Sequence, residues 1–130
     1  MPTMPERCVG RGSPRFRLMT CSGRRARVRA MPSWVYLLHP PRTGFVATIT
    51  EDEAALMHAH ADYLAALLDQ GVLVLAGPTL GETNTGITVF EADDEDAARA
   101  VMLADPAVTG GLMTPELRPM RVRFLRGRED

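Results

Sequence analysis

The chain has 130 residues and a formal net charge of −1, so its length fits a single domain. It contains no run of about 18 or more apolar residues, and residues 1–30 lack the apolar stretch of a secretory signal, which argues against a membrane-spanning or secreted protein. Both cysteines, Cys8 and Cys21, lie in that first segment. The rest of the chain can therefore form no disulfide, and we expect a cytoplasmic protein.

Charge is divided unevenly along the chain. Residues 1–30 hold eight arginines and one acid, a net charge of +7, whereas residues 31–130 hold seven arginines and 15 acids, a net charge of −8. Because the first segment also lacks apolar periodicity, we expect it to be disordered and the folded domain to span residues 31–130. The segment could be a nucleic-acid or membrane-surface arm, an organelle transit peptide or, as we favour, sequence upstream of a true start at Met31. The acidic domain itself is not expected to bind nucleic acid or a membrane.

The first predicted elements are a strand and a long helix. Trp34–Leu38 is rich in aromatic and β-branched residues and is followed by two prolines, which predicts a strand. Thr50 and Glu53 then have the spacing of a helix capping box. Apolar residues recur at three- and four-residue intervals after it and stop before a glycine, which predicts a helix over Glu51–Gln70.

The next two predicted elements are strands. Val72–Ala76 is short and apolar on both alternating faces, so we predict a strand covered on both sides and ended by Gly77 and Pro78. A polar, glycine-containing loop over Leu80–Thr85 separates it from the strand Gly86–Glu91.

The last predicted elements are a second helix and a final strand. Asp93 or Asp94 caps a helix over Glu95–Ala104, and a further turn can start at Pro106. In Leu117–Leu125 apolar residues alternate with arginines, which predicts a strand with one solvated face.

The predicted order is β-α-β-β-α-β, which is typical of a ferredoxin-like α+β fold with two helices on one face of a four-stranded antiparallel sheet. The central strands are apolar on the other face too, and a monomer would expose that face to water. We therefore predict a homodimer in which two sheets meet face to face. A monomer whose own loop covers this face is the alternative.

His60 is the first candidate for chemistry, because helical spacing places it on the apolar stripe with Leu56 and Leu64. An imidazole buried there needs a partner, and Tyr63 can reach the same side of the helix. His58 lies about 200° around the helix from His60, so the two cannot share a metal ion. A core histidine that bonds a hydroxyl or a carbonyl is equally consistent with this pattern.

Asp105 and His39 are the other candidates. Asp105 precedes a proline, where an aspartate is often a cap or turn residue. His39 ends the first predicted strand, where a loop can host function. The acids Asp93–Asp96 favour a capped helix start over a metal site, because they lack the glycine and distal glutamate of a calcium loop. With no nucleotide-binding, zinc or nucleophile motif in the sequence, we predict no metal and no cofactor.

Five short motifs, in their order and spacing, resemble the YciI-like (YCII-related) proteins over about residues 32–125: His60–Leu64, Gly71, Ala76–Pro78, Ala104–Pro106 and Glu116–Pro119. The resemblance implies a dimeric α+β barrel in which His60 and Asp105 approach each other in a pocket as a catalytic pair. Tyr63, His39, Gly77 and Pro78 are then expected to bind the substrate. The family chemistry is of the acid–base type, and dehydrochlorination of a chlorinated hydroxyquinone is one activity in the broader group.

The resulting hypothesis is a small enzyme in which a carboxylate fixes an imidazole that moves a proton. Isomerisation, elimination or hydrolysis of a small polar or aromatic metabolite would follow from that step. The alternative is a non-catalytic dimer that binds a small ligand or serves as an accessory module of another enzyme.

Overall fold

The computed structural model describes residues 31–127. The predicted disorder of residues 1–30, and the three roles considered for that segment, lie outside the described residues. The elements in chain order are the strand β1 Ser33–His39, the 3-10 turn η2 Val46–Thr48, the helix α1 Glu51–Asp69, the strands β2 Leu73–Pro78 and β3 Gly86–Glu91, the helices α2 Glu95–Leu103 and α3 Pro106–Thr109, and the strand β4 Thr114–Met120. This is the predicted β-α-β-β-α-β order, with η2 as an addition and with α3 as the further turn predicted from Pro106.

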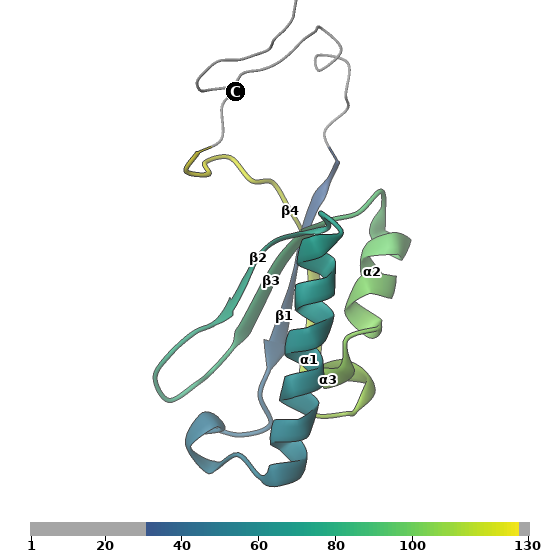
Figure 1. Cartoon of the computed structure of the whole chain (residues 1–130). Helices are drawn as coiled ribbons and strands as arrows, with labels where there is room; N and C mark the ends of the chain where they lie inside the picture. Colours follow the sequence, from purple (N-terminus) through teal and green to yellow (C-terminus); the bar gives the residue numbers. More distant parts are fainter. Residues whose placement is uncertain (1–30, 128–130) are drawn as a thin grey trace, which may run out of the picture. The chain divides into compact units, whose positions relative to one another are not determined.

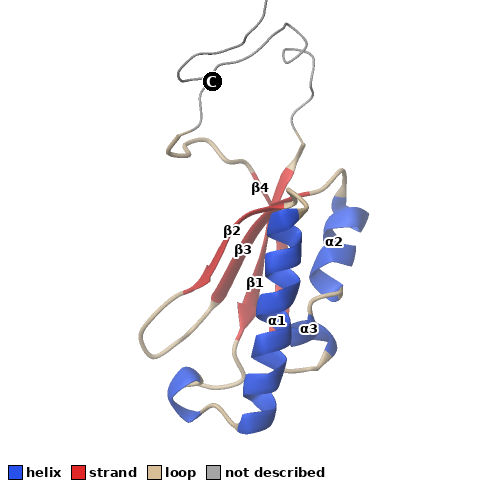
Figure 2. Cartoon of the chain, viewed as in Figure 1, coloured by secondary structure: helices blue, strands red, loops and turns tan. Residues whose placement is uncertain are grey.

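The strands form one antiparallel sheet in the order β2-β3-β1-β4. The helices α1, α2 and α3 lie together on one face of it (Figures 1 and 2). The predicted ferredoxin-like α+β arrangement is therefore confirmed. None of the described helices combines the length and the apolar character needed to cross a membrane.

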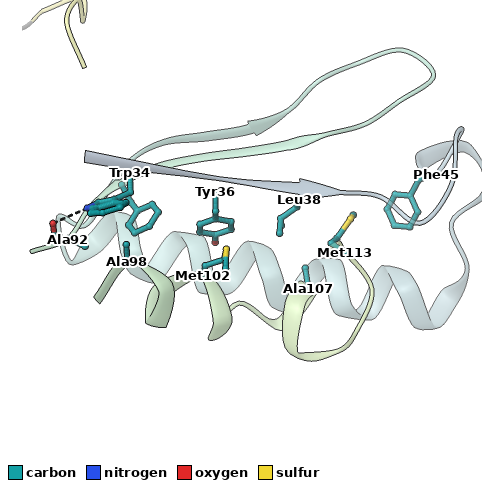
Figure 3. Packing of buried hydrophobic residues seen from close by; sticks show 10 residues of the cluster. Trp34, Tyr36, Leu38, Phe45, Ala92, Ala98, Met102, Ala107 and Met113 are labelled. Atoms are coloured by element: carbon teal, nitrogen blue, oxygen red, sulfur yellow. Dashed lines mark hydrogen bonds between the residues drawn. The ribbon is translucent and has the colours of Figure 1, made fainter. Parts of the chain in front are cut away.

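The two faces of the sheet differ in what covers them. Side chains of β1 are alternately buried and half-buried, and Trp34, Tyr36 and Leu38 point toward the helices (Figure 3). We call this the covered face. The opposite face, which we call the open face, carries the alternate residues, among them Leu37 and His39, and no helix of residues 31–127 lies on it.

The helix α1 begins where the capping box predicts. The Thr50 side chain accepts a hydrogen bond from the Glu53 amide, and the Glu53 carboxylate accepts one from the Thr50 amide. Arg42 donates to both oxygens of Glu53, at 2.9 and 2.7 Å, and these bonds lower the pKa of Glu53 to about 2. The helix is thus fixed at its first turn, and Gly71, with φ of 77°, follows its end.

The core lies between the covered face and the helices. Trp34 Nε1 donates to the Ala92 carbonyl at 3.2 Å. The Tyr36 ring meets the Phe90 ring edge to face at 5.6 Å between centroids. Ala98 and Met102 of α2 pack from the helical side (Figure 3). Tyr36 is thereby held in one orientation at the centre of the sheet.

The last strand differs from the prediction of Leu117–Leu125. The strand β4 spans Thr114–Met120 and is an edge strand that pairs only with β1, whose first residue, Ser33, is the partner of Met120. The ladder therefore ends where β1 begins. Prolines at positions 115 and 119 place their nitrogens on the same side of the strand, and an edge strand has a free side where no donor is needed.

The second strand also differs from the prediction. Gly77 and Pro78 belong to β2, paired with Ile87 and Gly86, rather than ending it. Within a single copy of the chain, the last four residues of β2 are exposed, so the predicted cover on both sides is not provided by this chain alone.

Candidate active site

His60 lies in the middle of α1, the helix that packs against the short helix α3. Gly110, which ends α3, makes this approach possible: a Cβ atom added there would lie 2.6 Å from Cδ2 of Leu56, one turn before His60. The two helix backbones are therefore close enough for a side chain of α1 to reach the start of α3.

Asp105 occupies that start. It is the N-cap residue of α3, with Pro106 in the first turn, and its Oδ1 accepts a hydrogen bond from the Ala107 amide at 2.9 Å. The cap role that the sequence suggested for Asp105 is therefore present. The carboxylate is also fully buried, so it needs further donors.

His60 supplies one of these donors. Its Nδ1 lies 2.8 Å from each oxygen of Asp105, and its side chain is 14% exposed while that of Asp105 is 0% exposed. An ionised carboxylate can only accept, so Nδ1 carries the proton. Within residues 31–127, Nε2 of His60 has no hydrogen-bond partner. The structure thus brings the two predicted residues together and leaves the second ring nitrogen without a hydrogen-bond partner in the described part of the chain.

Tyr36 is a third member that the sequence analysis missed. Its hydroxyl donates to Oδ2 of Asp105 at 2.7 Å, and both residues are fully buried. The alternation of the first strand does place Tyr36 beside Trp34 and Leu38 on one face, and a buried tyrosine hydroxyl needs a partner. That pattern could have marked Tyr36 as a polar group of the core.

The charges of these groups follow from their surroundings. Burial raises the pKa of Asp105, but the hydrogen bonds from His60, Tyr36 and the Ala107 amide outweigh it, so the pKa is lowered overall. Burial, followed by the bond to the Asp105 carboxylate, raises the pKa of Tyr36 well above its usual range. The site therefore holds one carboxylate and one neutral phenol at neutral pH.

The other predicted site residues are not hydrogen-bonded to this pair. Tyr63, one turn after His60, donates to the Val101 carbonyl of α2 at 2.6 Å, and burial, with the Asp105 charge, raises its pKa. Gly77 and Pro78 are the exposed end of β2. None of the described hydrogen bonds joins these three residues to His60 or Asp105.

His39 lies on the open face rather than beside His60. Its Nε2 is 3.0 Å from Oε1 of Glu116, and Arg118 donates to the other oxygen of Glu116 at 2.6 Å. His39 and Glu116 are 43% and 35% exposed. The sheet therefore separates a second, exposed histidine–carboxylate pair from the buried one.

The acids near α2 serve as caps. Asp94, one of the two predicted cap residues, accepts a hydrogen bond from the Ala97 amide at 2.9 Å. Within the described range, no group of three or more His, Cys, Asp or Glu side chains is arranged to hold a metal ion.

Comparison with known proteins gives the family. The model of the YCII-related domain matches residues 34–121, most of the described part. This chain belongs to the YCII-related domain family. The fold of this chain is also similar to that of 5-chloro-2-hydroxyhydroquinone dehydrochlorinase from Burkholderia phenoliruptrix AC1100, which was solved in complex with 2,5-dihydroxybenzoquinone. That chain is 19% identical, the alignment covers 74% of this chain and 99% of the other, and the TM-score is 0.52, which shows a shared fold. No curated protein matches the sequence.

Proposed function

We propose that this YCII-related domain is a small enzyme of the general acid–base type, in which His60 moves a proton and Asp105 orients it. The observation that carries the proposal is the bond from His60 Nδ1 to a fully buried, ionised carboxylate, with Nε2 free of other partners. A carboxylate on one ring nitrogen fixes the tautomer and makes the other nitrogen a better base. The arrangement is suited to removing a proton from a bound molecule.

The catalytic step follows from this geometry. Nε2 takes a proton from an acidic C–H or O–H group of the substrate, and Asp105 stabilises the imidazolium that forms. The electron pair left on the substrate then shifts within it, which gives isomerisation, or expels a leaving group, which gives elimination. For hydrolysis Nε2 takes the proton from a water molecule instead, the resulting hydroxide attacks the substrate, and the imidazolium gives the proton to the leaving group. All three reactions share the proton transfer to Nε2, and none of them requires a redox cofactor.

The substrate class we propose is a small polar or aromatic metabolite. The structural neighbour is named as a dehydrochlorinase of a chlorinated hydroxyhydroquinone, and loss of HCl is an elimination that begins with removal of a proton. Tyr63 follows His60 by one turn of α1, and its hydroxyl is bonded to the Val101 carbonyl. We propose that its aromatic ring, and not its hydroxyl, contacts the substrate. Binding roles for Gly77, Pro78 and His39 stay predictions, and His39 could meet a ligand only on the open face.

We also propose that the functional unit is a homodimer in the cytoplasm. The open face carries Val35, Leu37 and Ile87, and Leu75 at its edge is 48% exposed, so a second copy would remove apolar surface from water. The absence of cysteine from residues 31–130 supports a reducing compartment. Ile87→Glu should convert the dimer to a monomer in sedimentation experiments, and a monomeric wild-type protein would contradict the proposal.

The proposed function is tested by removing the charge of Asp105 while keeping its shape. Wild-type protein should turn over a member of a panel of hydroxylated aromatic compounds, beginning with 5-chloro-2-hydroxyhydroquinone. Asp105→Asn should lower that rate by roughly 100-fold or more, the usual contribution of an oriented acid–base group. Glu116→Gln makes the same change on the open face and should keep the rate. Equal rates in both variants would eliminate the pair as the catalytic unit.

The non-catalytic alternative predicts a different result. The bonds of Asp105 also cap α3 and tie α1 to the sheet, which a binding module would need as well. Such a module would show no turnover of any compound in the panel, but 2,5-dihydroxybenzoquinone or another member would still raise its Tm. That combination would replace the enzyme with a ligand-binding dimer.

A further inference from the structure

Tyr36 is more tightly constrained than its role as a core residue requires. It belongs to the central strand β1, is fully buried, and packs edge to face on Phe90. Its paired residue on the neighbouring strand β3 is Thr88, which is 2% exposed. A hydrogen bond from Thr88 lowers the pKa of Tyr36 and so partly opposes the effect of burial. The Tyr36 hydroxyl therefore cannot turn to solvent, and its proton is directed to Asp105.

The donors around Asp105 are distributed in a definite way. Oδ1 accepts the Ala107 amide at 2.9 Å, and Oδ2 accepts the Tyr36 hydroxyl at 2.7 Å. Nδ1 of His60 lies at the same distance, 2.8 Å, from both oxygens. The Ala107 amide on Oδ1 is fixed by the backbone of α3, and the Tyr36 hydroxyl on Oδ2 is fixed by the sheet. Together they set the plane of the carboxylate, and that plane sets the orientation of the imidazole.

We propose that Tyr36 is a positioning residue for His60: by donating to Oδ2 it holds the Asp105 carboxylate in place and keeps the shared proton on Nδ1. Nε2 then meets a ligand as a base and not as an acid. The use of that base rests on the proposed function, but the position of the proton can be measured without any substrate.

The ionisation of the Asp105 carboxyl depends on the donors that it receives. Hydrogen bonds to an ionised carboxylate favour the ionised form, and Tyr36 provides one of the bonds that lower the pKa of Asp105. Without the hydroxyl, one oxygen of Asp105 loses its fixed donor and the carboxylate is free to rotate. The bond that favours a proton on Nδ1 then loses its fixed geometry, so the ring would sample its two neutral tautomers.

The test is nitrogen NMR of the His60 side chain in the full chain, at a pH above the titration of the ring. The wild type should show a protonated Nδ1 and an unprotonated Nε2. Tyr36→Phe should shift these signals toward a mixture of both tautomers and raise the pKa of the Asp105 carboxyl. Tyr63→Phe removes a hydroxyl that bonds a backbone carbonyl instead, and should leave both readouts as in the wild type. An unchanged tautomer in Tyr36→Phe would overturn the inference.

A second measurement changes the donor without removing it. The chain has only two tyrosines, so fluorotyrosine incorporated into the Tyr63→Phe variant labels Tyr36 alone. Fluorine acidifies the phenol and strengthens its donation, so the pKa of Asp105 should fall further. A pKa that rises or stays constant would contradict the positioning role. Because neither readout uses turnover, an inactive protein with the expected shifts would refute the enzyme and keep the role of Tyr36.

Discussion

The described part of the chain carries a histidine–carboxylate pair on each face of its sheet. His60–Asp105 on the covered face and His39–Glu116 on the open face have similar distances, 2.8 and 3.0 Å. Their surroundings differ. Asp105 is buried and is held by two neutral donors fixed in the core, whereas Glu116 is partly exposed and is shared with the flexible cation Arg118.

This comparison shows that the residue types alone do not make a site. At the surface, water and salt screen the attraction, and a long cationic side chain can compensate the carboxylate whether or not the histidine is present. In the core, Asp105 depends on each of its donors, and His60 can bond only where those donors direct it. Substitutions at the buried pair should therefore have large effects on stability, whereas the exposed pair should respond mainly to salt.

The largest effect on stability is expected from deleting the buried carboxylate. Asp105→Ala leaves the Tyr36 hydroxyl, the His60 Nδ1–H and the Ala107 amide without an acceptor in the core. We expect the free energy of unfolding to fall by about 3–5 kcal/mol. Glu116→Ala removes an acceptor from side chains that are already partly exposed in the single chain, and should change it far less. Urea denaturation of both variants measures the difference, and similar losses would contradict the comparison.

An intermediate effect is expected from forcing the two helices apart. In Gly110→Ala the new methyl group would meet Leu56 Cδ2 at 2.6 Å and the Pro106 carbonyl oxygen at 3.0 Å. We expect a loss of about 1–3 kcal/mol from overpacking, together with a weaker bond between His60 and Asp105. Gly77→Ala meets nothing within 4 Å and serves as the matched control. Equal stability of the two variants would show that α3 can move without cost.

The smallest effect is on the titration of the two carboxyls. Burial opposes the ionisation of Asp105, but its three hydrogen bonds lower its pKa below the ordinary 3.8, so its stabilising contribution is complete above that pH. The contribution is lost as the pH falls through the lower folded value. The bond to His39, then that to Arg118, lowers the pKa of Glu116.

Carbon NMR of the carboxyls at low and high salt separates the two cases. At about 1 M salt the Debye length is only about 3 Å, so the pKa of Glu116 should return toward its ordinary value while that of Asp105 stays low. If both carboxyls respond to salt alike, the buried pair is not shielded from solvent as the structure indicates.

The sequence predicts the elements better than their contacts. The capping box at Thr50 fixes the start of α1, and helical spacing places His60 on its packed side, both from local patterns. The alternation of β1, which buries Trp34, Tyr36 and Leu38, also implies that His39 faces the other way. The alternation alone could therefore have separated His39 from His60. Its position beside a loop suggested instead that the two histidines line one site.

Contacts between distant segments could not be predicted in the same way. Tyr36 and Asp105 are 69 residues apart, and no local periodicity relates a strand to the cap of a helix so far along the chain. The motif Asp105-Pro106 suggested a partner for His60 only through its resemblance to the family. The strand β4 begins and ends earlier than the alternation of apolar residues and arginines over Leu117–Leu125 predicts, because its length is set by pairing with β1, whose first residue is the partner of Met120.

The most direct test of the account compares two histidines of the same helix. His58 and His60 both lie on α1, but His58 is exposed and His60 bonds Asp105. On whichever compound of the panel the wild type turns over, His60→Ala should lower kcat/KM by roughly 100-fold or more, and His58→Ala should keep the wild-type value. A His60→Ala variant as active as His58→Ala would contradict the central claim that the imidazole held by Asp105 performs the chemistry.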